Sequence, residues 1–75
     1  MTQYMITSSG QYDWEEVNAT TLRGAKMIAS RTFCPSVGGC IEVGIKHAYE
    51  LEHGTEYDIQ TVAVKYGFDK WYDVN

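Results

Sequence analysis

The part of the sequence that decides the fold is TLRGAKMIASRTF, residues 21–33. Its apolar side chains recur three or four residues apart, which places them on one side of an α-helix and the basic side chains on the other. Thr20 or Thr21 is expected to begin the helix, because a threonine hydroxyl accepts a hydrogen bond from an unpaired amide of the first turn. The apolar positions are Leu22, Ala25, Ile28, Ala29 and Phe33, and the basic positions are Arg23, Lys26 and Arg31.

A strand is predicted after this helix. Pro35 and the Gly38-Gly39 pair prevent the helix from continuing, so residues 34–39 are expected to form a loop. The next segment, residues 40–46, alternates strictly between apolar and polar side chains, which is the pattern of a strand with one buried face. The same alternation allows the strand to continue through Tyr49 and Leu51.

Two further strands are predicted towards the C-terminus. Residues 52–55 favour a turn, and residues 57–65 are rich in β-branched and aromatic side chains. Residues 67–69 predict a tight connection, and residues 70–74 predict a last short strand. Acidic side chains gather around the predicted hairpin end, as charges do on a solvated edge. They are Glu50, Glu52, Glu56 and Asp58.

The N-terminal segment predicts a strand over residues 2–7, and the turn formers at residues 8–11 allow a hairpin. Residues 12–17 would return as an exposed edge strand, because three of them are acidic. The order is therefore strand, a possible second strand, helix, and three more strands. This order predicts an α+β fold, one domain over residues 1–75, with a single helix packed on one face of an antiparallel sheet of four to five strands.

The composition narrows the class of protein. The chain has 75 residues, 44% of them hydrophobic and 13% aromatic, which suits one small core and not two. Its formal net charge is −4, whereas a general nucleic-acid binder needs surplus cations, so direct nucleic-acid binding is expected to be absent or secondary. No apolar run approaches the roughly 20 residues of a membrane span, and residues 1–8 lack the pattern of a signal peptide. A cytoplasmic protein without membrane contact is expected.

The residue types that hold metals or perform catalysis do not occur at suitable spacings. The order Cys34, Cys40, His47, His53 resembles a zinc site, but five residues separate the cysteines, and structural zinc sites usually place them about two to four residues apart. A thiolate at Cys34 would lie at the helix end that disfavours negative charge. The sequence therefore predicts no metal, no cofactor and no catalytic residue, and it favours a binding protein over an enzyme.

The predicted helix is the first candidate binding surface. It carries half of the six cations of the chain, and no acid occurs between Leu22 and Phe33. Met27 lies in the middle of the basic side, and methionine adapts well to contact surfaces. Two interpretations remain open: a docking face for a partner, or an ordinary solvated helix face that carries one methionine.

The C-terminal segment is the second candidate. Its aromatic rings lie close to two lysines, a mixture that suits the anchoring of a partner or the stacking of bases, although filling of the core accounts for part of it. Alternation along the last strand predicts that Trp71 faces the helix and Tyr72 faces away, or the reverse. The residues concerned are Lys65, Tyr66, Phe68, Lys70, Trp71 and Tyr72.

Two stretches resemble the ninth type I-F anti-CRISPR family of phage proteins. The first is AKMIASRTFC, residues 25–34, followed by a glycine-containing loop and an alternating strand, and the second is KWYD, residues 70–73. The resemblance covers about half of the chain. Members of that family are similarly short and have one helix on an antiparallel sheet. Helices of the form Leu-x-x-Ala-Lys-x-Ile-Ala also occur in other small phage proteins, including inhibitors of host RNA polymerase.

The resemblance implies a protein that binds the backbone subunits of an RNA-guided CRISPR surveillance complex and blocks hybridisation of target DNA to the guide. Lys26, Arg31 and Lys70 match basic positions of the family, whereas Met27 stands where the family has a further basic residue. The overall acidity also departs from the family and argues against direct contact with DNA. The candidate partner-binding residues are Arg23, Lys26, Met27, Arg31, Lys70 and Tyr72.

Two functions are therefore expected from the sequence. The first is a phage-type inhibitor that docks on a host protein or ribonucleoprotein complex through the helix. The alternative is a small accessory domain that inhibits another host protein, such as RNA polymerase, through the aromatic C-terminal hairpin.

Overall fold

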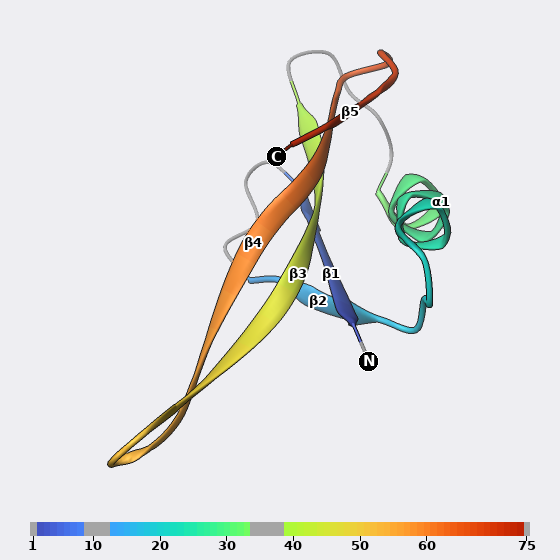
Figure 1. Ribbon diagram of the computed structural model, residues 1–75. Helices are drawn as coiled ribbons and strands as arrows, with labels where there is room; N and C mark the ends of the chain where they lie inside the picture. Colours follow the sequence, from blue (N-terminus) through green and yellow to red (C-terminus); the bar gives the residue numbers. More distant parts are fainter. Residues whose placement is uncertain (1, 9–12, 34–38, 75) are drawn as a thin grey trace.

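The computed structural model describes residues 2–8, 13–33 and 39–74. One helix packs on a five-stranded antiparallel sheet of order β2-β1-β3-β4-β5, which confirms the predicted α+β fold (Figure 1). The elements are β1 (Gln3–Ser8), β2 (Glu15–Val17), α1 (Leu22–Thr32), β3 (Cys40–Leu51), β4 (Gly54–Tyr66) and β5 (Trp71–Asp73).

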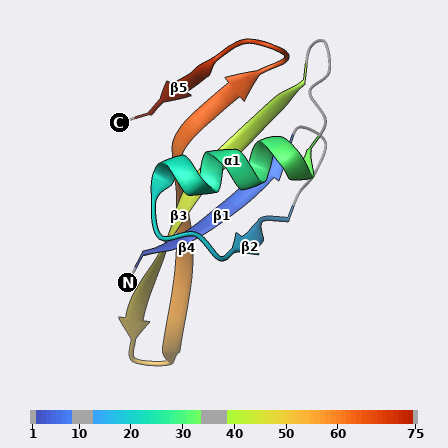
Figure 2. The ribbon, with the colours of Figure 1, turned by 90° about the vertical axis from the view of Figure 1, so that its right-hand side faces the viewer.

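The helix begins and ends as its sequence indicates. Thr21 has extended backbone angles, and its hydroxyl accepts a hydrogen bond of 3.1 Å from the Gly24 amide, which identifies Thr21, and not Thr20, as the N-cap. The amide of Phe33 donates to the Ala29 carbonyl at 2.9 Å and closes the last turn. The helix lies across one face of the sheet, over β1 and β3 (Figure 2).

The main core lies between α1 and this face of the sheet. Ala25 and Ala29 are fully buried and face Ile6 and Val43, and the short alanine side chains let the helix approach the strands closely. The predicted apolar side of the helix is confirmed, since Leu22, Ile28 and Phe33 pack around the same cluster. Only a few residues are fully buried, as expected for a small domain.

A smaller apolar contact covers the opposite face of the sheet. Met5 is buried there and pairs with Gly44, above which the Trp14 ring packs. A Cβ atom on Gly44 would lie 2.6 Å from Ile59 Cγ2 and 3.1 Å from both the Gln60 carbonyl oxygen and Trp14 Cη2. Glycine is therefore needed at position 44 because Trp14 and β4 come too close for a side chain.

The pairing of β3 with β4 contains one irregularity. Val43 pairs with Ala63 but Gly44 pairs with Thr61, so Val62 has no partner on β3 and forms a β-bulge. The bulge shifts the alternation of β4. On the C-terminal side of the bulge, Ala63 faces the helix. On its N-terminal side, towards the arm, the even-numbered residues of β4, such as Gln60, share that face with Ile45.

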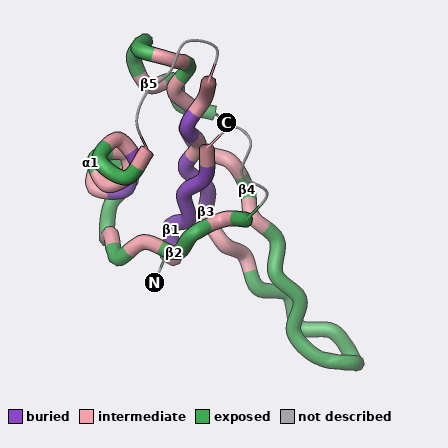
Figure 3. Tube along the Cα trace, turned by 180° about the vertical axis from the view of Figure 1, so that it is seen from behind, coloured by how far each residue is buried: buried purple, intermediate pink, exposed green. Residues whose placement is uncertain are grey.

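The β3–β4 hairpin extends well beyond the rest of the sheet. The last pair between β1 and β3 joins Gln3 to Lys46, and from there residues 47–58 pair only with one another. We call residues 47–58 the arm. Every residue from Ala48 to Asp58 is exposed, and Figure 3 shows the arm as a continuous exposed ribbon. The arm gives the molecule its elongated shape, 44 × 24 × 22 Å.

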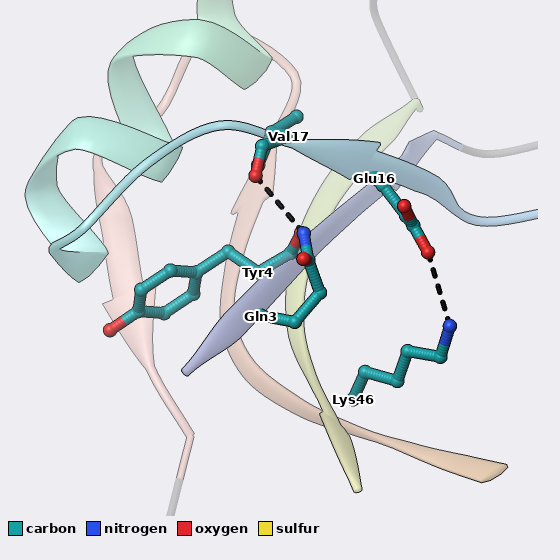
Figure 4. A network of polar contacts seen from close by, with 5 residues as sticks. All are labelled: Gln3, Tyr4, Glu16, Val17 and Lys46. Carbon is teal, nitrogen blue, oxygen red and sulfur yellow. Dashed lines mark hydrogen bonds and ion pairs between the residues drawn. The ribbon is translucent and has the colours of Figure 1, made fainter. Parts of the chain in front are cut away.

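Polar contacts hold the base of the arm to the short strand β2. Lys46 pairs with Glu16 at 3.1 Å, and the Gln3 side-chain amide donates to the Val17 carbonyl at 3.1 Å (Figure 4). The Lys46 ammonium group also lies 4.3 Å from the centre of the Tyr57 ring. Lys46 thus links β2 to the arm where the arm leaves the sheet, and Gln3 links β1 to β2 beside it.

Several predicted boundaries differ from the observed ones. Residues 12–17 were expected to form a strand, but β2 contains only Glu15–Val17, because Trp14 turns onto the sheet face instead of joining the ladder. The predicted turn at residues 52–55 contains only Glu52 and His53 outside the strands, so β4 begins at Gly54. The predicted turn at residues 8–11 and loop at residues 34–39 lie mostly outside the described residues.

Candidate functional site

A groove runs between α1 and β5 on the helix side of the sheet. Its volume is about 370 Å³. Five of its six residues come from the outer side of the helix and one from the last strand. They are Arg23, Lys26, Met27, Ser30 and Arg31, together with Trp71.

The helical repeat and the strand repeat together build this groove. Positions 23, 27 and 30 succeed one another along one side of α1, with Lys26 and Arg31 beside them. Trp71 pairs with Lys65, on the helix side of β4, while Tyr72 pairs with Val64 and points to the other face. The predicted opposite orientation of these two rings is confirmed, since Trp71 packs against the core and Tyr72 is exposed.

The groove has an apolar floor and a cationic rim. The Trp71 ring is half-buried, and Met27 is 58% exposed above it. Arg23 and Arg31 are exposed, and neither forms a salt bridge with any residue that the structure describes. Arg31 lies in the last turn of α1, where a positive charge is favoured by the partial negative charge of the helix C-terminus.

Lys26 differs from the two arginines. Its ammonium group is paired with Asp73 of β5 at 2.7 Å, and its side chain is only 21% exposed. The pair connects the middle of α1 to the last strand, beside the groove. Of the three helical cations named as candidates from the sequence, Lys26 is thus already held by Asp73.

Lys70 and Tyr72 belong to a different surface from the groove. Tyr72 lies on the sheet face opposite the helix, 6.3 Å from the Tyr66 ring, and the Lys70 ammonium group lies 5.7 Å from the Tyr72 ring centre. Phe68 lies nearby in the sequence, in the connection between β4 and β5, and is 72% exposed. The six residues predicted as one binding set thus divide between two faces of the molecule.

Asp69 fixes the orientation of Tyr72. The Tyr72 hydroxyl donates a 2.8 Å hydrogen bond to the Asp69 carboxylate, which also accepts a bond from the Lys70 amide. The hydrogen bond from Tyr72, followed by the one from the Lys70 amide, lowers the pKa of Asp69. The same bond to Asp69 raises the pKa of Tyr72, because ionising the phenol would place a negative charge beside a carboxylate.

Sequence reasoning found four of the five helical residues of the groove, but it missed Ser30 and did not place Trp71 beside them. Trp71 was assigned to the aromatic hairpin, because a sequence does not show that the last strand comes beside the helix. The pairing of β4 with β5 brings them together. A second cavity of about 340 Å³, next to β2, contains only one charged residue. Its residues are Thr2, Gln3, Glu16, Val17, Asn18, Ala19 and Thr20.

The residues considered for a metal site are spread apart. His47 and His53 lie in the arm, where His47 is hydrogen-bonded to Gln60 and His53 to Glu56. Cys34 lies outside the described residues. In residues 2–8, 13–33 and 39–74 no three metal-binding side chains come together. Within the same ranges, no helix has the length and apolar character to cross a membrane.

Comparison with known proteins gives no assignment. The chain matches no protein-family model, and no curated protein or solved structure is significantly similar to it. Its candidate site therefore consists of the groove between α1 and β5, with the aromatic face of the C-terminal hairpin as a second surface.

Proposed function

We propose that this chain is a small inhibitor that acts by binding a host macromolecular complex through the groove between α1 and β5, and not by catalysis. The observation that carries the proposal is the pair of exposed arginines, Arg23 and Arg31, beside the apolar floor of Met27 and Trp71. A cationic rim around an apolar centre suits a protein partner that offers an apolar side chain flanked by carboxylates.

The proposed target is a type I CRISPR surveillance complex in the host cytoplasm. The support is the resemblance of residues 25–34 and 70–73 to the ninth type I-F anti-CRISPR family, together with the position of Arg31 in the groove. Once bound to the backbone subunits, a protein with a net charge of −4 would repel the phosphates of approaching DNA. Steric and electrostatic exclusion of target DNA then requires no direct contact with nucleic acid.

The test uses purified surveillance complex and the double variant Arg23→Glu with Arg31→Glu. These residues make no internal ion pair with the described part of the chain, so their reversal should cost only the favourable position of Arg31 at the helix C-terminus, about 1 kcal/mol, and should leave the chain folded. Binding measured by biolayer interferometry should weaken at least about 100-fold, because like charges would face the partner. Unchanged affinity would exclude the groove as the docking surface.

Lys70→Glu provides the matched control. It reverses one charge on the opposite face of the sheet, beside Tyr72, and should leave binding through the groove unchanged. If this variant loses affinity and the arginine variant does not, the docking surface is the aromatic face.

A second function rests on that aromatic face. Phe68, Tyr66 and Tyr72 are exposed together with Lys70, and exposed aromatic rings are frequent anchors of protein interfaces. On this alternative the chain inhibits another host protein, with RNA polymerase as the first to be tested. Phe68→Ser, which removes the most exposed ring without touching the groove, should then abolish inhibition of transcription in a purified assay.

A further inference from the structure

The arm carries large apolar side chains that are largely exposed to solvent. Tyr49, Leu51 and Tyr57 are 50%, 45% and 60% exposed. A two-stranded ribbon without a packed face is only marginally stable in water. A surface of this kind is expected to gain stability when a partner covers it.

One face of the arm combines apolar and acidic side chains. The register pairs Tyr49 with Glu56 and His47 with Asp58, so these four side chains lie on the same face, which Leu51 continues to the tip. This face contains no lysine or arginine, whereas the opposite face begins with Lys46. It therefore offers two apolar side chains with two exposed carboxylates beside them, of which Glu56 also forms a hydrogen bond with His53 at the tip of the arm.

The groove between α1 and β5 offers the complementary arrangement. Its floor is Met27 and Trp71. Its charges that are unpaired within the described residues are those of Arg23 and Arg31, since Asp73 already pairs with Lys26. Apolar side chains would meet apolar side chains, and two carboxylates would meet two guanidinium groups, which bind carboxylates in a fork-like geometry.

The lengths of the two surfaces also agree. The free part of β3, residues 47–51, spans about 16 Å at the rise of a β-strand. The 11 residues of α1 span about the same length at the rise of a helix. The arm leads away from α1 in all of the views, so it does not reach the groove of its own chain (Figures 1 and 2).

From this complementarity we propose that the occupant of the groove in the free protein is the arm of a second copy of the chain. The two copies exchange arms reciprocally, each arm seated on the groove of the other. A reciprocal exchange has two-fold symmetry and closes as a dimer, whereas a one-way contact would leave open ends and build a chain of molecules. The dimer contains two identical arm-to-groove contacts.

The proposed dimer and the proposed host target use the same groove, so they compete. Arm exchange is measured on the purified protein without any target, and its failure leaves the inhibitor proposal untouched. Conversely, a chain that dimerises but binds no host complex retains arm exchange and loses only the inhibitor proposal.

The experiment is a charge swap followed by sedimentation velocity over a concentration series. The groove variant is Arg23→Glu with Arg31→Glu, and the arm variant is Glu56→Lys with Asp58→Lys. Each variant alone places like charges in both contacts, so its dimer dissociation constant should rise at least about 100-fold. An equimolar mixture restores opposite charges in both contacts, and it should form a heterodimer as readily as the unmodified chain forms its dimer.

Two controls accompany the swap. Glu15→Lys, on the exposed strand β2, reverses one carboxylate outside both surfaces and should not change the dissociation constant. Tyr49→Ser with Leu51→Ser removes the apolar part of the arm face without changing its charge, and it should also weaken the dimer. It tests the arm independently of the charge variant, should that variant fail to fold. Raising the salt from about 0.05 M to about 0.5 M should weaken the unmodified dimer about tenfold.

The outcomes separate clearly. A chain that is monomeric up to about 0.5 mM overturns the proposal, because its self-affinity is too weak for the contact described. The acidic arm would then be a surface for a basic partner protein. A dimer that survives both charge variants overturns it as well, because its interface would lie elsewhere. Loss in each variant and recovery in the mixture support it.

Discussion

Trp71 contributes both to the core and to the candidate binding groove. Its ring packs against the core beneath α1, and the same ring forms the floor of the groove. The alternation of the last strand predicted that either Trp71 or Tyr72 faces the helix, but it did not choose between them. The choice depends on the register of β5 against β4, which pairs Trp71 with Lys65, and such pairing depends on packing that a single sequence does not display.

A pH titration tests the bond between Tyr72 and Asp69. The pKa of Tyr72 should lie above its ordinary value of about 10, and Asp69→Asn should lower it towards that value. The bond stabilises the fold below pH 10, and the contribution disappears as the pH rises through the raised pKa of Tyr72. At the acid end it disappears as the pH falls through the lowered pKa of Asp69.

The Tyr72 titration is best followed by NMR of ¹³C-labelled tyrosine rings. Asp58→Asn is the control, because it removes a carboxylate in the arm and should leave the pKa of Tyr72 unchanged. An identical Tyr72 pKa in the unmodified chain and in Asp69→Asn would show that the bond does not persist in solution.

The close approach at Gly44 leads to a second residue-level prediction. Gly44→Ala should lower the free energy of unfolding by about 1–3 kcal/mol, because the added methyl group must displace Ile59 and also crowds the Gln60 carbonyl and the Trp14 ring. Urea denaturation followed by tryptophan fluorescence measures the change. A variant as stable as the unmodified chain would show that Trp14 and β4 move apart at no cost.

At the level of elements, the helix was predicted more accurately than the strands. Its apolar positions recur with a helical period, and its ends are marked by a capping threonine and by the change of pattern after Phe33. The second strand was predicted too long, since a pattern of alternating residues does not reveal that Trp14 leaves the ladder. The bulge at Val62 was not predicted either, because it depends on how two strands are paired and not on either strand alone.

The N-cap of α1 is open to a direct test. Thr21→Ala removes the hydroxyl that accepts the Gly24 amide and should cost about 1 kcal/mol of stability. Thr20→Ala, one position earlier on an exposed residue, should change stability by less than about 0.5 kcal/mol. Thermal denaturation followed by circular dichroism compares the two. Equal losses would contradict the assignment of Thr21 as the cap.

At the scale of the whole molecule, the chain consists of a compact body and a projecting arm. The sequence indicated that the long strand could continue to Leu51, and its acidic cluster was interpreted as a solvated edge. The sequence did not show that the pairing of β1 with β3 ends at Gln3 and Lys46 and leaves residues 47–58 without a third strand beside them. The length of the arm therefore results from the difference between the lengths of β1 and β3, which no local pattern expresses.

Shortening the arm tests whether the body is independent of it. Replacing residues 49–56 by Asn-Gly joins Ala48 to Tyr57, which pair directly, through a two-residue turn that keeps the register. The core between α1 and the sheet is untouched, so the free energy of unfolding at low protein concentration should change by less than about 1 kcal/mol. A large loss, measured by urea denaturation, would mean that the arm supports the body.

The bulge at Val62 determines which side chains of β4 in the arm lie on the helix side of the sheet and which lie on the opposite side. Because one extra residue is accommodated there, Glu56 and Asp58 lie on the helix side, and Tyr57 and Ile59 on the other. If Val62 instead joined the ladder and no residue were set aside, the register of the outer half of β4 would shift by one residue and the two sets would exchange faces. Loss of the Val62 codon would remove the bulge and yet keep every pair of the arm, whereas an extra residue paired into the ladder at that point would turn the acidic side chains of β4 to the opposite face.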